Sequence, residues 1–221
     1  MIFEEVKFKT SLLKELKIFY VQNLGIGLLK EDDSSFTLTV GETSLTFIQT
    51  DEKDDRPFYH FAVNINESQF KLAKEYLSKR VTLLQNESHD EFEFIDWNAH
   101  AVYFYDPSGN IVEYIARHNI KSTATDEFTN KDILCISEVG LPVLDVSNVA
   151  STLESEINLP IWKGNGKSFQ PVGDEHGLFI LVEIDREWYP TNDKAQIFPV
   201  MVKIKDSDRQ YSFPHLPYYI V

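Results

Sequence analysis

The order of strand and helix patterns repeats along this 221-residue chain, and the repeat constrains the possible folds more than any other feature. Residues 4–10 alternate apolar and polar side chains, which is typical of a half-buried strand. Residues 11–24 change to the apolar spacing of a helix, and two β-rich runs between residues 35 and 49 predict a hairpin. The first unit is therefore a strand, a helix and a group of strands.

The same order returns after residue 59 and again after residue 133. The apolar spacing predicts the corresponding helices at residues 67–79 and 146–157. After residue 205 the chain is too short to hold a further helix. The pattern therefore predicts an α+β fold with three complete units and a truncated fourth.

A polar stretch, residues 119–132, divides the repeat into two halves and has the composition of a linker. We expect a first domain at residues 1–118, which holds two units. We expect a second, similar half at residues 133–221, degenerate at its C-terminal end.

The charge balance argues against several classes of partner. The chain has 35 acidic and 21 basic side chains, and its net charge of −14 disfavours binding to nucleic acids and to anionic membranes. Cys135 is the single cysteine, which excludes a disulfide within the chain. The N-terminal residues lack the basic and apolar regions of a signal peptide. We therefore expect a cytoplasmic protein whose partner is a small molecule.

The most specific motif runs from Val102 to Glu113 and reads V-Y-F-Y-D-P-S-G-N-I-V-E. It combines an aromatic strand, a D-P-x-G-N turn and a second strand with a glutamate three residues after the asparagine. A further motif, H-F-A-V, begins at His60, and residues 13–25 contain a helix that ends with F-Y and L-G. A fainter one, E-V-G-L-P-V, begins at Glu138.

Together these motifs resemble the vicinal oxygen chelate superfamily, which includes glyoxalases, fosfomycin- and bleomycin-resistance proteins and extradiol dioxygenases. The resemblance implies repeated βαβββ modules, with paired sheets around a concave cavity and a truncated fourth module. It covers residues 1–118 well, and the second half as far as about Ile184.

Strand parity places the candidate ligands on the inner face of such a cavity. Alternate residues of a strand share a face, so His60, Ala62 and Asn64 point in one direction. Glu113 and Glu138 each lie on the face opposite their plainly apolar neighbours. A cup lined by carboxylates, imidazole and aromatic side chains suits a small molecule.

The resemblance implies that His60, Glu113 and Glu138 bind a divalent metal ion such as Fe, Mn, Ni or Zn. In the family, one ligand comes from the first strand of one module and two come from the module paired with it. Pairing of modules two and three joins Glu138 to His60 and Glu113, whereas pairing of modules one and two supplies Glu5 instead. The reciprocal site has Pro199 at the position of His60, so we expect one metal site per chain.

Residues of the strand that begins at His60, and residues in and just before the motif from Val102 to Glu113, are candidates for chemistry and for substrate binding. The acid–base chemistry of extradiol enzymes needs a histidine or tyrosine, and His100 and Tyr103 are the candidate catalytic residues. Asn64, Trp97 and Tyr105 are the candidates for substrate binding.

Two functions are compatible with these residues. The first is a metal-dependent enzyme, of the dioxygenase or the lyase/isomerase type, that acts on a small substrate with vicinal oxygens. Thr46 occupies the position of a fourth metal ligand of glyoxalases, which argues against glyoxalase I. The alternative is a metal-free protein that binds or sequesters a small molecule, such as a drug. In either case we expect a monomer, whose halves form a pseudo-dimer, or a homodimer.

Overall fold

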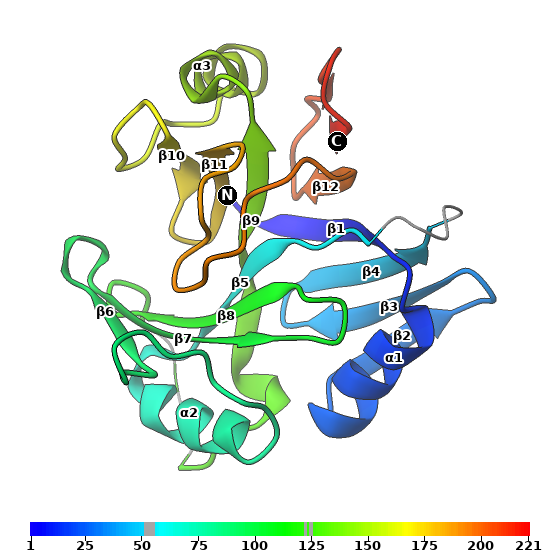
Figure 1. Cartoon of the computed structure of the whole chain (residues 1–221), viewed down its shortest axis with the longest axis vertical. Coiled ribbons are helices and arrows are strands. Elements are labelled where there is room, and N and C mark those ends of the chain that lie inside the picture. Colours follow the sequence, from blue (N-terminus) through cyan, green and yellow to red (C-terminus); the bar gives the residue numbers. More distant parts are fainter. Residues whose placement is uncertain (51–55, 122, 124–125) are drawn as a thin grey trace.

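The computed structural model describes residues 1–50, 56–121, 123 and 126–221, and these residues form two seven-stranded sheets (Figure 1). The first sheet has the strand order β13-β14-β12-β1-β4-β3-β2. Its strands are β1 (Phe3–Thr10), β2 (Gly27–Glu31), β3 (Ser35–Val40), β4 (Thr43–Gln49), β12 (Val200–Ile204), β13 (Tyr211–Ser212) and β14 (Tyr218–Ile220).

The second sheet has the strand order β10-β11-β9-β5-β8-β7-β6. Its strands are β5 (His60–Ile65), β6 (Phe92–Phe94), β7 (Ala99–Tyr105), β8 (Ile111–Arg117), β9 (Ile133–Val143), β10 (Phe169–Asp174) and β11 (Gly177–Glu183). This sheet carries the candidate ligands of the sequence analysis.

The α-helices of the described chain lie at the two ends of the molecule, with α3 at one end and α1 and α2 at the other (Figure 1). They are α1 (Leu13–Lys17), which continues as a π-helix over Ile18–Asn23, α2 (Phe70–Ser78) and α3 (Val146–Ile157). Short 3-10 helices span Glu67–Gln69, Ile95–Trp97 and Asn130–Asp132. None of the helices in the described part of the chain is long and apolar enough to cross a membrane.

The predicted α+β fold of paired modules is confirmed. Helix α2 follows the first strand of its module and buries Phe70, Ala73 and Leu77 along one side, which explains why this segment is helical. Residues 205–221 are all described and contain no helix, so the fourth module is truncated as predicted. The short strands β13 and β14 take the place of the missing elements.

Each sheet combines strands from both halves of the chain. β1 pairs antiparallel with β12 in the first sheet, and β5 pairs antiparallel with β9 in the second (Figure 1). The first module therefore shares a sheet with the fourth, and the second module shares a sheet with the third. Residues 122 and 124–125 of the predicted linker lie outside the described residues, and the division into two domains stays a prediction.

Aromatic side chains pack the two sheets against each other. Phe8 of β1 stacks on Tyr59, with ring centroids 4.3 Å apart, and its centroid lies 5.5 Å from that of Phe61 on β5. Burying one such ring contributes about 1.5–3 kcal/mol. Because Phe61 faces this core, His60 and Ala62 face the other side of the second sheet.

The turn between β3 and β4 forms another contact between the sheets. Gly41 in this turn has a φ of +59°, and a Cβ added to it would lie 2.1 Å from the backbone oxygen of Leu134 on β9. The backbone N–H of Glu42 donates a hydrogen bond of 2.8 Å to the same carbonyl. A glycine is therefore required both for the conformation and for the close approach.

Substitution Gly41→Ala should lower the free energy of unfolding by about 3 kcal/mol, because it adds a backbone clash to the strain of a positive φ. Gly109→Ala is the matched control, since Gly109 also has a positive φ, of +80°, but has no atom within 4 Å of the added Cβ. The control should lose only about 1–2 kcal/mol. Urea denaturation of both variants measures the difference, and equal losses would contradict the proposed contact between the sheets.

Candidate metal centre

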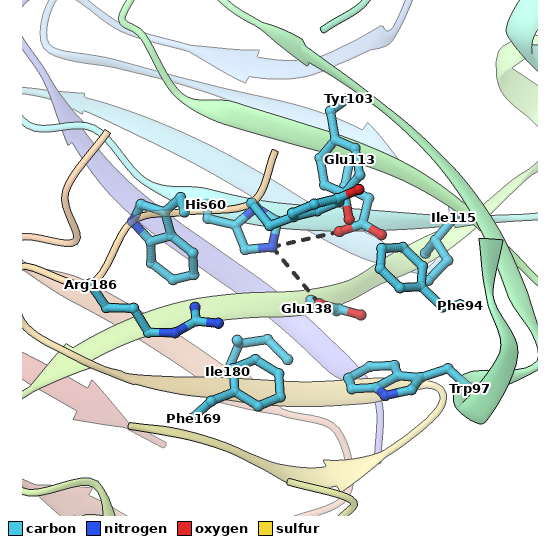
Figure 2. A pocket seen from close by; sticks show the side chains of 12 residues that line it. His60, Phe94, Trp97, Tyr103, Glu113, Ile115, Glu138, Phe169, Ile180 and Arg186 are labelled. Atoms are coloured by element: carbon cyan, nitrogen blue, oxygen red, sulfur yellow. Dashed lines mark ion pairs between the residues drawn. The ribbon is translucent and has the colours of Figure 1, made fainter. Parts of the chain in front are cut away.

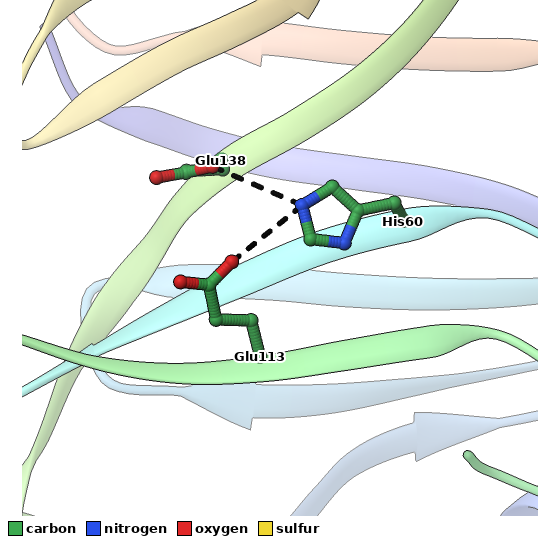
Figure 3. A group of neighbouring side chains, drawn as sticks. All are labelled: His60, Glu113 and Glu138. Atoms are coloured by element: carbon green, nitrogen blue, oxygen red, sulfur yellow. Dashed lines mark ion pairs between the residues drawn. The ribbon is translucent and has the colours of Figure 1, made fainter. Parts of the chain in front are cut away.

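The register of the second sheet brings three distant side chains together. β5 lies between β8 and β9, and Ala62 is paired with Glu113 on one side and with Glu138 on the other. Paired residues on neighbouring strands share a face, and His60 shares it too because it lies two residues before Ala62. The candidate ligand atoms of His60, Glu113 and Glu138 all lie within 4.8 Å of one another (Figure 3).

A backbone carbonyl orients the imidazole of His60. The Nδ1 atom lies 3.1 Å from the oxygen of Ile111, which can only accept a hydrogen bond, so Nδ1 carries the proton. The Nε2 atom then presents its lone pair to the two carboxylates (Figure 3). Metal-binding histidines are commonly fixed in this way by a hydrogen bond from the other ring nitrogen.

The distances between the three groups suit a shared metal ion. Nε2 of His60 lies 3.6 Å from Oε2 of Glu113 and 3.8 Å from Oε2 of Glu138, which is too far for a hydrogen bond. Ligand atoms about 2.0–2.3 Å from one ion are roughly 2.8–3.8 Å apart at the angles of tetrahedral and octahedral sites. The three groups therefore need only small adjustments to bind one ion.

The charges at this position also fit a cation. Glu113 and Glu138 are 3% and 5% exposed, and burial together with the charge of Glu138 raises the pKa of Glu113 well above its usual value. The buried Arg117 forms an ion pair with Glu138, so it balances one of the two carboxylates. A divalent cation would balance the other and remove the penalty of burying it.

A chain of hydrogen bonds sets the orientation of Glu138. Arg117 donates through Nη2 to Oε1 of Glu138 and through Nε to Oδ1 of Asn64 at 3.1 Å. Asn64 donates in turn to the backbone oxygen of Glu175 at 2.9 Å. Oε2 of Glu138 is thereby left facing His60.

Asn64 was predicted to bind substrate. In the structure it positions Arg117, and it is not among the described residues that line the cavity.

The three groups line a cavity of about 330 Å³, which is near the lower end of the range for small-molecule sites (Figure 2). Most of its wall is aromatic or aliphatic. The lining residues are His60, Phe94, Trp97, Tyr103, Glu113, Ile115, Glu138, Phe169, Ile180, Arg186, Trp188 and Tyr189.

Two of the other predicted site residues, Tyr103 and Trp97, lie in this cavity. Tyr103 is paired with Glu113 between β7 and β8, so the two side chains share a face of the sheet. Burial and the charges of Glu113 and Glu138 raise the pKa of Tyr103 well above its usual value, so the phenol keeps its proton. The ring centroid of Trp97 lies 5.3 Å from the guanidinium carbon of Arg117.

His100 and Tyr105 are not among the described residues that line the cavity. His100 lies three residues from Tyr103, so its side chain is on the opposite face of β7, where its Nδ1 is 2.8 Å from Nε2 of His118. Tyr105 is at the exposed end of β7 and donates a hydrogen bond to Asp193. The geometry therefore gives no support to catalysis by His100 or to substrate binding by Tyr105.

Glu5, the alternative ligand, lies in the first sheet. Its carboxylate forms an ion pair of 3.0 Å with Lys7 on the same strand, β1. Thr46 is in the same sheet, on β4, and hydrogen-bonds to Thr37 at 2.8 Å. Glu138, and not Glu5, is the carboxylate that lies beside His60, as expected when modules two and three pair.

One wall of the cavity was not predicted from the sequence. Arg186, Trp188 and Tyr189 come from the loop that follows β11, and the ring centroid of Trp188 lies 4.9 Å from that of His60. No periodic pattern marks this loop, and the recognisable motifs end at about Ile184. In the sequence, the only sign that this loop lines a cavity was the presence of three large side chains within four residues.

Comparisons with known proteins are consistent with this architecture. No protein-family model matches the sequence, and no curated protein matches it. A candidate dioxygenase from Bacillus subtilis has a similar structure, with a TM-score of 0.64 and 17% identity over 92% of this chain and 70% of the other. Glyoxalase I from Zea mays has a TM-score of 0.56 and 16% identity over 91% of this chain and 74% of its own. The chain therefore has the vicinal oxygen chelate fold.

Substitution Glu113→Gln should change how stability depends on pH in the metal-free protein. The pKa of Glu113 is raised on folding, so the carboxyl favours folding most below its unfolded pKa of about 4.3, and this contribution declines as the pH rises toward the folded pKa. Glutamine has no charge to bury. The melting temperature of Glu113→Gln should therefore fall less than that of the wild type between pH 5 and 8, as measured by calorimetry.

Glu5→Gln is the matched control, because Glu5 is partly exposed and pairs only with Lys7 among the described ion pairs. Its melting temperature should follow that of the wild type throughout this pH range, since such exposed pairs contribute little. If the melting temperature of Glu113→Gln has the same pH dependence as that of the wild type, burial of the Glu113 carboxylate does not destabilise the protein.

Proposed function

We propose that this protein is a metal-dependent enzyme of the vicinal oxygen chelate type, and that His60, Glu113 and Glu138 bind one divalent first-row metal ion. The observation that carries the proposal is the buried group itself. Its imidazole nitrogen faces two carboxylates without a direct hydrogen bond to either. The similar folds of a candidate dioxygenase and of glyoxalase I agree with this type of chemistry.

The donor set of one nitrogen and two carboxylate oxygens suits Fe(II), Mn(II), Ni(II) or Zn(II). The neighbouring strand β11 faces this side of the sheet with Leu178, Ile180 and Val182, which cannot bind a metal. Three protein ligands leave coordination positions for the substrate. When bound, the ion would hold two vicinal oxygens of the substrate and stabilise negative charge on them.

The other residues of the cavity would position the substrate. Tyr103 keeps a protonated hydroxyl beside Glu113, so it can donate a hydrogen bond to a substrate oxygen at this site. Trp97 and Trp188 would hold a flat substrate and exclude water from it. His100 has no part in this proposal, because its side chain lies on the other face of β7.

The apolar walls of the cavity also support the alternative, a metal-free binding protein. Such a protein would need the volume and the aromatic side chains but not the buried carboxylates. Metal binding therefore separates the two functions.

Protein that is purified without a metal-affinity tag and stripped with a chelator should bind one Mn(II) or Zn(II) per chain. At a free metal concentration about 100 times the Kd, the melting temperature should rise by roughly 5–10 °C. His60→Ala should weaken binding by about 100-fold or more, because it removes the nitrogen ligand. Calorimetric titration and elemental analysis measure both effects.

His100→Ala is the control, since it removes a histidine of β7 whose side chain does not line the cavity. It should bind the metal as the wild type does. An unchanged melting temperature in the presence of every one of the four metals, with no bound metal in the wild type, would contradict the enzyme and leave the binding protein as the better account.

A further inference from the structure

Arg186 is a cation in the cavity wall that forms no ion pair with any residue that the structure describes. Its guanidinium points into the cavity toward Glu138 (Figure 2). Among the described residues no ion pair or side-chain hydrogen bond involves it, although the chain carries a net charge of −14. The half-buried group lies over Phe169, with its central carbon 5.2 Å from the ring centroid.

The contrast with Arg117 shows what is unusual about Arg186. Arg117 is buried and is paired with Glu138 and Asn64. Burial lowers the pKa of the Arg186 guanidinium, and no neighbouring carboxylate opposes this shift. A guanidinium that is partly removed from water without a partner costs free energy, unless a ligand supplies the missing anion.

The loop that carries Arg186 is held in place. The backbone N–H of Ala195 donates to the oxygen of Arg186 at 2.8 Å, and the N–H of Asp185 donates to the oxygen of Ala195 at 2.9 Å. Trp188, two residues further on, is 5% exposed and packs beside His60. The guanidinium is therefore presented to the cavity by an ordered segment.

The shape and composition of the cavity limit the ligand. Phe169 supports one face of the guanidinium, so its edge is available to a planar anion that accepts two parallel hydrogen bonds. Trp97, Trp188 and Phe94 provide flat apolar walls. A volume of about 330 Å³ admits a compound of one or two rings.

We propose that the substrate of this site is a small aryl carboxylate, whose ring lies between the aromatic walls and whose carboxylate binds Arg186. One part of this inference rests on the proposed function: the substrate would also carry two adjacent oxygens, and these would face the metal site. The recognition of the carboxylate itself requires no metal.

The test uses 2-naphthoate and its neutral analogue 2-naphthamide, titrated into metal-free protein with tryptophan fluorescence as the signal. The wild type should bind the carboxylate at least roughly tenfold more tightly than the amide, as expected for a charged hydrogen bond. Arg186→Met should reduce this preference to about one. Arg186→Lys should retain part of it, because a point charge replaces the planar fork.

Lys163→Met is the matched control, since Lys163 is an exposed cation whose ammonium group contacts the backbone oxygen of Asp96. It should keep the preference of the wild type. Equal binding of the two ligands by the wild type, no binding of naphthoate at millimolar concentration, or an unchanged preference in Arg186→Met would overturn the inference.

Metal titration of Arg186→Met separates this inference from the proposed function. If the metal binds normally in the wild type and the carboxylate preference is absent, the inference fails and the enzyme assignment stands. If the preference is present and no metal binds, Arg186 recognises anions in a metal-free binding protein.

Discussion

Ala62 is paired with Glu113 on β8 and with Glu138 on β9, and the candidate metal centre depends on this double register. A slip of one residue in either pairing would turn a carboxylate to the opposite face of the sheet, into the core. The core prevents such a slip, because Phe61 and Val139 pack there from the neighbouring positions. The small side chain of Ala62 leaves the space between the carboxylates open.

The cost of burying two carboxylates explains the arrangement around them. Arg117 forms its ion pair with Glu138 and is itself held by Asn64, whereas Glu113 has no ion pair with an arginine or lysine among the described residues and stays destabilised, as its raised pKa indicates. Such a cost in a fold that is otherwise internally consistent is typical of a functional site. A bound cation would relieve it, and this links the stability of the protein to its proposed activity.

Much of the fold was predictable from the sequence. In each complete module the apolar residues change from the alternating spacing of a strand to the spacing of a helix, and this change recurs along the chain. The convergence of His60, Glu113 and Glu138 was predictable from motifs and strand parity, once modules two and three were paired. Two kinds of feature were not predictable. The loop that carries Arg186 and Trp188 has no periodicity, and its position over the cavity is set by tertiary contacts. Strand parity placed Asn64 on the face of His60, but its hydrogen bonds to Arg117 and Glu175 come from another strand and a loop. His100 was named with Tyr103 as a candidate catalytic residue, although the two lie three residues apart on one strand and therefore on opposite faces.

The central claim is that His60, Glu113 and Glu138 bind one metal ion, and an anomalous diffraction map collected at the absorption edge of manganese tests it most directly. Crystals grown with Mn(II) should show one strong peak in the cavity, about 2.0–2.3 Å from Nε2 of His60 and from an oxygen of each glutamate. A map with no peak at this position, from crystals saturated with the metal, would contradict the account.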